Sequence, residues 1–358
     1  MSADASDSGP DDGSFAPPDH PAIPPRRVGV LLVNLGTPDA AEPKAVRRYL
    51  KEFLSDRRVI DYPKALWAPI LHGIILNTRP AKTAKAYASI WMEDENASPL
   101  AYYTQRHSDL LAERLGGAAV VDYAMRYGNP SIKSRLRALQ EKGCDRILIV
   151  PLYPQYSATT TATVCDAAFD ALKELRWTPA VRIAPPFHDE MRYIKALGES
   201  VRRAFAKAGS LPERVVISFH GLPERYFLEG DPYHCHCQKT ARLLREEMGW
   251  TKDYAPITFQ SKFGPETWLG PATDATLHRF ADEGVKDVAV ITPGFVADCI
   301  ETLEEIGIAA KEDFVEAGGR SLLQIPCLND AREAIDLYET IVRRELSGWA
   351  TPVTTPAE

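Results

Sequence analysis

The sequence has no long uninterrupted run of apolar residues. A membrane-spanning helix needs roughly 18 or more of them, and the nearest candidate, residues 65–76, contains Pro69 and His72. Residues 1–25 are rich in aspartate and proline and have neither a basic start nor an apolar stretch. They predict a disordered tail and exclude a secretory signal. We therefore expect a protein that does not span a membrane.

Cysteine is scarce, and basic residues are fewer than acidic ones. The 6 cysteines are scattered over 358 residues, which favours reduced thiols and a cytoplasmic location. The formal net charge of -7 lacks the basic excess that neutralises nucleic-acid phosphates, so no nucleic-acid partner is expected. A G-x-G-x-x-G fingerprint and a Walker sequence are also missing, and nucleotide binding has no support.

What the sequence does contain is a repeated strand-then-helix pattern. Short β-branched runs are each followed by a segment of helical periodicity, which predicts an α/β fold with parallel sheets covered on both faces. The length exceeds the usual size of one hydrophobic core. We therefore expect two similar Rossmann-like lobes, each a four-stranded parallel sheet flanked by helices. The predicted strands are 28–34, 119–124, 146–152, 181–185, 215–219, 257–260, 288–292 and 322–325.

The domain boundaries are less clearly marked, because no glycine-serine linker is present. We expect an N-terminal lobe over 26–157, to which 327–347 returns as the last helix, and a C-terminal lobe over 158–326. A second disordered tail is expected over 348–358. An apolar insert over 57–80 lies between the first two strands. Its periodicity fits a lid over a binding site and a buried helical pair covering a sheet edge equally well.

Two strand ends present candidate chemistry, since ligands of open α/β sheets bind where strands end. His220 follows the strand 215–219 and enters a glycine-proline turn. A lone histidine is more often structural, but this position favours function. After the strand 288–292 come Asp298, Glu301 and Glu305. Asp298 suits a helix cap as well as a site.

The two glutamates are one helical turn apart and share a face, so they either pass a cation along a line or form a solvated acidic stripe. One imidazole and one carboxylate at adjacent strand ends suit proton transfer, or the passage of a borderline cation such as Fe²⁺. A third firm ligand is missing, so permanent metal storage is not expected. The alternating His234 to Cys237 tract does not have the spacing of a zinc or iron-sulfur site.

Five separated motifs give the sequence a family resemblance. Residues 30–38, 151–157, 218–223, 259–264 and 298–305 resemble ferrochelatases, in the family's order, over about 28–346. The resemblance implies a porphyrin cleft between two Rossmann-like lobes. It also implies an enzyme, a lyase that inserts Fe²⁺ into protoporphyrin IX to form protohaem in the terminal step of haem biosynthesis.

The resemblance assigns roles to individual residues. The family's catalytic histidine and glutamate fall on His220 and Glu301, on opposite sides of the inserted metal, and it leaves open which of them takes the pyrrole protons. We expect Glu305 to join them in handling iron. The family's cleft-lining positions fall on residues that we expect to bind substrate, although aromatics near strand ends are often core: Arg126, Tyr127, Tyr156, Trp268 and Phe295. Of these, Arg126 is expected to meet the propionates.

Departures from other members limit the resemblance. Cys299 stands where some members have a second histidine, so a strict two-histidine mechanism is not expected. Ala158 replaces a cluster cysteine and no cysteine follows Cys327, which predicts that no [2Fe-2S] cluster or other cofactor is present.

Alternatives to the ferrochelatase reading remain. A cobalt chelatase of the same architecture and a non-catalytic haem carrier are the rival functions, and coproporphyrin III is the rival substrate. The sequence around His220 looks more like the protoporphyrin type. The apolar stretch 62–76 suggests a peripheral contact with the inner face of a membrane.

Overall fold

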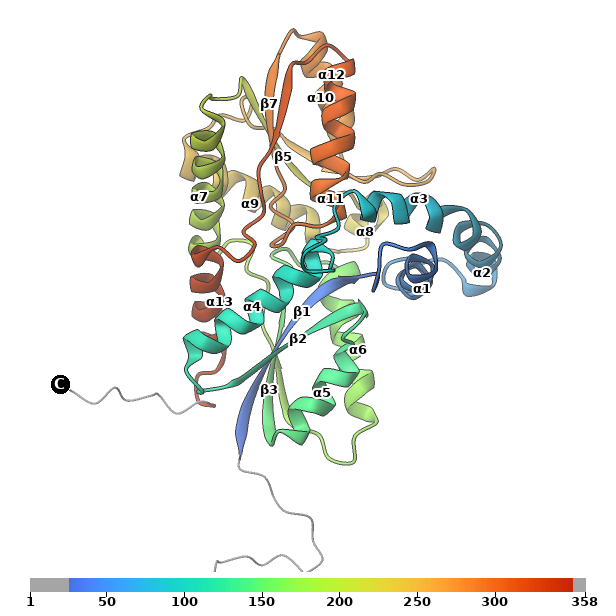
Figure 1. The fold of residues 1–358 in the computed structure, drawn as a ribbon, viewed down its shortest axis with the longest axis vertical. Helices are drawn as coiled ribbons and strands as arrows, with labels where there is room; N and C mark the ends of the chain where they lie inside the picture. Colours follow the sequence, from blue (N-terminus) through green and yellow to red (C-terminus); the bar gives the residue numbers. More distant parts are fainter. Residues whose placement is uncertain (1–25, 350–358) are drawn as a thin grey trace, which may run out of the picture.

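The computed structural model describes residues 26–349 (Figure 1), so the tail expected over 1–25 lies outside the described residues. The described chain forms two four-stranded parallel sheets, with the orders β2-β1-β3-β4 and β6-β5-β7-β8. This confirms the predicted α/β architecture. The strands are β1 (Arg27–Thr37), β2 (Val120–Gly128), β3 (Cys144–Pro151), β4 (Ala180–Ile183), β5 (Arg214–His220), β6 (Ile257–Gln260), β7 (Asp287–Ile291) and β8 (Ser321–Gln324).

Helices cover both faces of each sheet. The α-helices are α1 (Pro43–Leu54), α2 (Lys64–Ile70), α3 (Leu76–Ala88), α4 (Pro99–Leu115), α5 (Ile132–Glu141), α6 (Thr163–Lys173), α7 (Met191–Ala208), α8 (Glu224–Leu228), α9 (Tyr233–Met248), α10 (Thr273–Asp282), α11 (Ile300–Leu303), α12 (Lys311–Glu316) and α13 (Arg332–Glu345). Three π-helical segments are η1 (Leu71–Ile75), η2 (Ala158–Ala162) and η3 (Glu305–Ala310). None of the helices in residues 26–349 is long and apolar enough to cross a membrane.

The central strand β1 shows why the strands could be recognised as apolar runs. Val30 and Leu32 are buried in one hydrophobic core, and the alternate residues Leu31 and Val33 are buried in another. Side chains of a strand alternate between the two faces of a sheet. A strand covered on both faces therefore needs apolar residues at every position.

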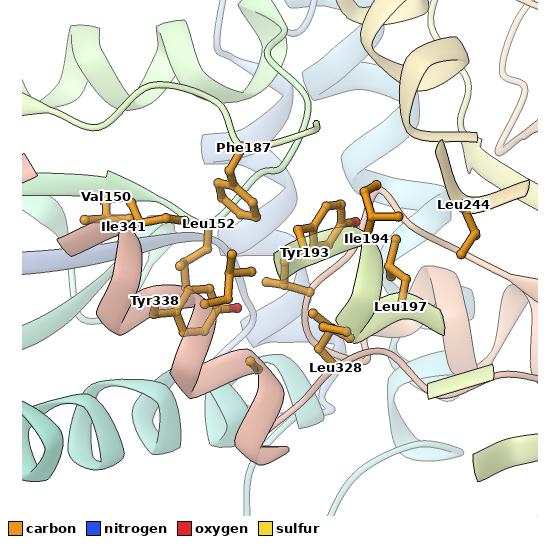
Figure 2. Packing of buried hydrophobic residues seen from close by; sticks show 14 of the residues in the cluster. Val150, Leu152, Phe187, Tyr193, Ile194, Leu197, Leu244, Leu328, Tyr338 and Ile341 are labelled. Atoms are coloured by element: carbon orange, nitrogen blue, oxygen red, sulfur yellow. The ribbon is translucent and has the colours of Figure 1, made fainter. Parts of the chain in front are cut away.

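The two lobes are joined by a shared core. Helix α7 leads from the first sheet to the second, and α13 packs against α4 and β3 of the first lobe. The two helices follow one another along one side of the molecule (Figure 1). Figure 2 shows Tyr193 and Leu197 of α7 in the same cluster as Tyr338 of α13 and Val150 of β3. The lobes are thus held together by a shared apolar core.

Two predicted boundaries are wrong. Strand β4 pairs with β3, so the first sheet extends past the divide expected between 157 and 158, and the second sheet begins only at β5. The reason is that α6 is an ordinary crossover between parallel neighbours, and no linker composition marked the true divide. The start of the second tail, expected at residue 348, is also wrong. Trp349 packs against the core, and the guanidinium carbon of Arg182 lies 4.1 Å from its ring centroid.

The insert after β1 forms a helical arm made of α1, α2, η1 and α3, which extends to one side of the two sheets (Figure 1). Leu71, Ile75 and Leu76 are buried together and anchor it. In contrast, Leu66 is 66% exposed and Ile74 58% exposed. The arm therefore has a packed inner face and an exposed apolar outer face.

Candidate active site

His220 is placed by a close approach of two backbones at the end of β5. The Gly221 amide donates to the Gln260 carbonyl at 2.7 Å. A Cβ on Gly221 would lie 2.7 Å from that same oxygen and 3.1 Å from the Trp268 ring, so only glycine fits. On the other side, the Tyr233 hydroxyl donates to the His220 carbonyl at 3.0 Å. The backbone that carries the imidazole is thus held from both sides.

The His220 ring has a defined hydrogen-bonding arrangement. Its Nδ1 lies 2.7 Å from the Gly221 carbonyl oxygen, which can only accept a hydrogen bond. Nδ1 must therefore carry a proton, and in the neutral ring Nε2 is left with a lone pair. The half-buried imidazole is consequently prepared to accept a proton through Nε2.

The loop after β7 carries the facing carboxylates, and Asp298 holds that loop in place. The buried Asp298 carboxylate accepts hydrogen bonds from the Thr302 hydroxyl at 2.9 Å and the Asn329 amide at 2.7 Å. The Asn329 carbonyl in turn lies 2.6 Å from Nε2 of His107 in α4. Of the two roles weighed for Asp298, these contacts favour the structural one, which ties the loop to the first lobe.

Glu301 faces the first lobe across a small cavity. Tyr49, Tyr87 and Thr37 line this cavity together with Glu301. Burial and then the nearby Glu301 raise the pKa of Tyr87 well above its usual value, and burial, Tyr87 and Glu301 do the same for Tyr49. Both phenols therefore remain hydroxyl groups beside the carboxylate. The Gln260 amide donates to the Glu301 carbonyl at 2.8 Å, which fixes its backbone.

Glu305 completes the site at the start of η3. Burial raises its pKa, and the neighbouring Glu301 adds to this, while the Ser261 hydroxyl and His220 act in the opposite direction. The Ser261 hydroxyl donates to Glu305 Oε2 at 2.6 Å. Glu305 thus lies close enough to both His220 and Glu301 for their charges to affect its pKa. A carboxyl with a raised pKa next to an imidazole suits proton transfer.

Ser261 and Gln260 are site residues to which sequence reasoning gave no role. Both lie in the motif 259–264, which was used only for the resemblance. Ser261 has a φ of 64°, a left-handed conformation that non-glycine residues rarely adopt. The side-chain hydrogen bond to Glu305 accompanies this conformation. The available signal in the sequence was a polar residue, Ser261, directly after the end of a predicted strand.

The acidic and imidazole groups do not form a preassembled metal cage. Within residues 26–349, no three His, Cys, Asp or Glu side chains are placed to hold a metal ion together, and this includes His220, Glu301 and Glu305.

The His234 to Cys237 tract lies in the first turn of α9. There the His236 ring stacks on His188 at a centroid distance of 3.7 Å and accepts a hydrogen bond from the Tyr156 amide.

Three predicted substrate contacts keep accessible surface. Trp268, Phe295 and Tyr156 are all half-buried. Trp268 packs against Gly221 directly after the histidine, and Phe295 packs beside Leu100 near the Glu301 loop. The indole Nε1 of Trp268 is buried without a hydrogen-bond partner in the described part of the chain. These positions are compatible with a ligand between the lobes.

The other two predicted contacts need correction. Tyr127 is completely buried, and its hydroxyl donates to Asp56 at 2.8 Å, so it does not line the cleft. Arg126 forms a largely buried ion pair with the same Asp56, and its Nε donates to the Thr163 carbonyl. Its guanidinium is therefore engaged within the fold and is not open to a propionate. The loop that brings Asp56 over the end of β2 gave no sign of this in the sequence.

Arg79 is a cation that the sequence reasoning missed. It lies on α3, with its guanidinium carbon 4.1 Å from the Phe263 ring centroid, and partial burial lowers its pKa. No carboxylate within residues 26–349 forms an ion pair with it. The arm carries several other Lys and Arg residues, so nothing in the sequence distinguished Arg79 from them.

Fold and site together define a two-lobed α/β protein with an imidazole, His220, at the end of β5 and two carboxylates, Glu301 and Glu305, after β7. Comparison with known proteins gives the family. The family model described as Ferrochelatase matches residues 27–346. The chain belongs to the ferrochelatase family.

Curated relatives agree over nearly the whole length. The ferrochelatase of Rhizobium meliloti is 57% identical over 92% of this chain and 98% of the relative. That of Agrobacterium fabrum is 54% identical over 94% of this chain and 98% of the relative. Among solved structures, SirB from Bacillus subtilis has a TM-score of 0.54 and 14% identity, covering 90% of this chain and 98% of its own. At that identity the likeness concerns the fold alone.

Proposed function

We propose that this protein inserts Fe²⁺ into protoporphyrin IX and releases protohaem, which is the terminal step of haem biosynthesis. The observation that carries the proposal is the His220 imidazole, whose Nδ1 is bound to a carbonyl and whose Nε2 is left to accept a proton. The curated relatives, named ferrochelatases, support the choice of metal and macrocycle.

The reaction requires the protein to remove protons from a planar ring. A free porphyrin carries two N–H groups, so entry of Fe²⁺ releases two protons and leaves the charge balanced. The ring must also bend before the metal can reach its nitrogens, and binding energy from the cleft walls can favour that bent form. His220 Nε2 takes a pyrrole proton, and the imidazolium formed is stabilised by Glu301 and Glu305.

Glu301 and Glu305 are proposed to act on the incoming Fe²⁺ and on the departing protons. Glu301 and Glu305 lie one helical turn apart, so they offer successive oxygen ligands to an incoming cation and successive acceptors to a departing proton. Burial raises the pKa of Glu305, which favours its protonated form more than exposure to water would. Neither group needs to bind iron permanently, in keeping with a metal that is a substrate.

The cleft walls would hold the ring and its propionates. Trp268, Phe295 and Tyr156 supply apolar surface, and the arm supplies more. Arg79 replaces Arg126 as the cation proposed to meet a propionate, because Arg126 is already paired with Asp56. No [2Fe-2S] cluster or other resident cofactor is proposed, and the purified protein should accordingly contain no acid-labile sulfide.

Multiple turnover is the test of this function. With Fe²⁺ and protoporphyrin IX under reducing conditions, haem should form in large molar excess over the protein, measured by its absorbance. A haem carrier would give no more than one equivalent. Parallel assays with coproporphyrin III, and with Co²⁺ and an early tetrapyrrole, test the two rival reactions. A higher kcat/KM in either of them would overturn the proposed substrate pair.

We also propose that the outer face of the arm contacts a membrane, from which a poorly soluble porphyrin can be delivered. Leu66, Ile70 and Ile74 are exposed apolar residues on α2 and η1. Isolated apolar residues are normal on a surface, but three on one short arm form a patch. The patch lies on the same arm as Arg79.

Replacing Leu66 and Ile74 with serine should raise the KM for porphyrin supplied in phosphatidylcholine vesicles by about tenfold, because two apolar contacts with the bilayer are lost. Thermal stability should change little, since both side chains are mostly exposed. Trp67→Ala is the matched control. Trp67 packs on the buried face of the arm and donates to the Leu54 carbonyl at 2.7 Å, so its loss should destabilise the arm. An unchanged KM in the double variant would rule out the membrane contact.

A further inference from the structure

The second lobe has a basic groove that the proposed reaction does not use. It lies between α9 and the start of the edge strand β6. Its cationic and polar lining residues are Gln238, Lys239, Arg242, Arg245 and Lys252, and Ile257 forms part of its apolar floor. Ile257 pairs with Ile217, whereas His220 pairs with Gln260 at the other end of β6. The groove is therefore at the opposite end of the sheet from the proposed active site.

Two of the four cations that line the groove form ion pairs with carboxylates, and two do not. Lys239 forms an ion pair with Asp189 at 2.6 Å, and Arg242 forms one with Glu246 at 2.6 Å. In the part of the chain that the structure describes, Arg245 and Lys252 form no ion pair. No carboxylate lines the groove. Two positive charges that no ion pair compensates therefore line the same groove, and one of them, Arg245, also feels the charge of Glu246.

Arg245 is the most informative of these residues. The residue is only 8% exposed, and burial lowers its pKa, while the nearby Glu246 carboxylate acts in the opposite direction. Its Nη1 donates to the Ala255 carbonyl at 3.1 Å. A buried guanidinium usually has a carboxylate or phosphate partner, because desolvating an unpaired charge is costly. A carbonyl satisfies one of its five N–H groups.

We propose that this groove binds a phosphate group, either as inorganic phosphate or as the head of a phosphate monoester. A monoester carries a charge of about -1.5 to -2 at neutral pH, which matches the two uncompensated cations. The guanidinium of Arg245 offers the planar fork that recognises phosphate oxygens, and the Gln238 amide adds a neutral donor. Pro256 and Ile257 offer apolar surface to the organic part of an ester.

Arg245 also has a structural role that the test must separate from binding. It lies in the last turn of α9, where a cation complements the helix dipole, and its bond to Ala255 anchors the helix to the chain before β6. Replacing Arg245 could therefore weaken the fold. Arg242 and Lys252 are exposed, so their removal should affect the groove without this complication.

Titration calorimetry of the full chain, at constant ionic strength set by chloride, tests the proposal. Inorganic phosphate and glycerol phosphate are titrated separately, and at least one should bind saturably with one site per chain. The double variant with Arg242→Ala and Lys252→Ala should bind about tenfold more weakly or worse. Tighter binding of glycerol phosphate identifies an ester site, and tighter binding of inorganic phosphate identifies a free-ion site.

Arg279→Ala provides the matched control. Arg279 forms an exposed ion pair with Glu283 four residues later at 2.7 Å, as Arg242 does with Glu246, but it lies on α10 outside the groove. This variant should bind like the parent protein. Absence of saturable binding for both ligands, or equal weakening by Arg279→Ala, would overturn the proposal. Tighter binding of an aspartate-rich peptide than of either phosphate would likewise overturn it in favour of a protein partner. Because the groove lies away from His220, His220→Ala should leave phosphate binding intact.

Discussion

His220→Ala is expected to lower kcat for haem formation by roughly 10²–10⁴-fold, the usual cost of losing a general base. The imidazole extends from the end of β5, and its ring bonds only to the neighbouring Gly221 carbonyl. The backbone bonds that hold the strand end involve Gly221 and the His220 carbonyl, and alanine preserves both. The folded structure should therefore survive while the proton acceptor is lost.

Steady-state kinetics and circular dichroism on the same preparations check this expectation. Glu301→Gln tests the carboxylate proposed to act opposite His220, because glutamine keeps the shape of the side chain and removes its charge. Exposed His278 on α10 offers the control His278→Ala, which should leave kcat unchanged. If the His220 variant retained more than about a tenth of kcat, a general-base role would not stand.

The fold could be predicted because its determinants are local. Parallel strands that are covered on both faces must be apolar at successive positions, and β1 is such a strand, with alternate residues in two cores. His220 was predictable for a related reason, since a histidine that follows an apolar strand lies at the ligand edge of the sheet. The shared core of α7 and α13 could not be predicted, because it depends on how the two sheets are placed relative to one another.

The errors concern residues whose partners are distant in the sequence. Arg126 was expected in the cleft, but its partner Asp56 is 70 residues earlier, in the loop between α1 and α2. Ser261 and Glu305 are 44 residues apart, and nothing in either segment predicts their hydrogen bond. Arg79 gained significance only when the structure placed it over the Phe263 ring, with no ion pair to a carboxylate among residues 26–349. The pattern of a strand predicts on which face of the sheet a side chain lies, but it does not predict which distant loop packs over that side chain.

The Asp56 carboxylate is the second position with a large expected effect, because three parts of the first lobe meet on it. Its Oδ2 accepts hydrogen bonds from the Tyr127 hydroxyl at 2.8 Å and the Thr163 hydroxyl at 2.6 Å, and it pairs with Arg126. Burial alone would raise the pKa of Asp56. The Thr163 hydroxyl, the Arg58 amide, the Tyr127 hydroxyl and Arg126 together outweigh it and lower this pKa below its usual value.

Asp56→Ala should reduce the free energy of unfolding by about 3–5 kcal/mol, since it leaves the buried Arg126 charge without its partner. The side chains of Arg126 and Asp56 are only 15% and 10% exposed. Asp170→Ala is the matched control. Asp170 pairs with Lys173, and the side chains of Lys173 and Asp170 are 75% and 74% exposed. Its loss should reduce the free energy of unfolding by only about 0–1 kcal/mol. Urea unfolding at neutral pH measures both variants, and equal losses would contradict the prediction.

The pH dependence of that loss gives an independent check on its origin. A carboxyl whose pKa is lower in the folded state stabilises the protein above its unfolded pKa, for which the reference value is 3.8, and that contribution is lost as the pH falls through the folded value. The stability difference between the parent and Asp56→Ala should therefore be constant from neutral pH down to about pH 5 and shrink below it. A second variant, Asp56→Ala with Arg126→Met, removes both charges and should recover part of the stability, because the remaining cost in the single variant is an unpaired buried guanidinium.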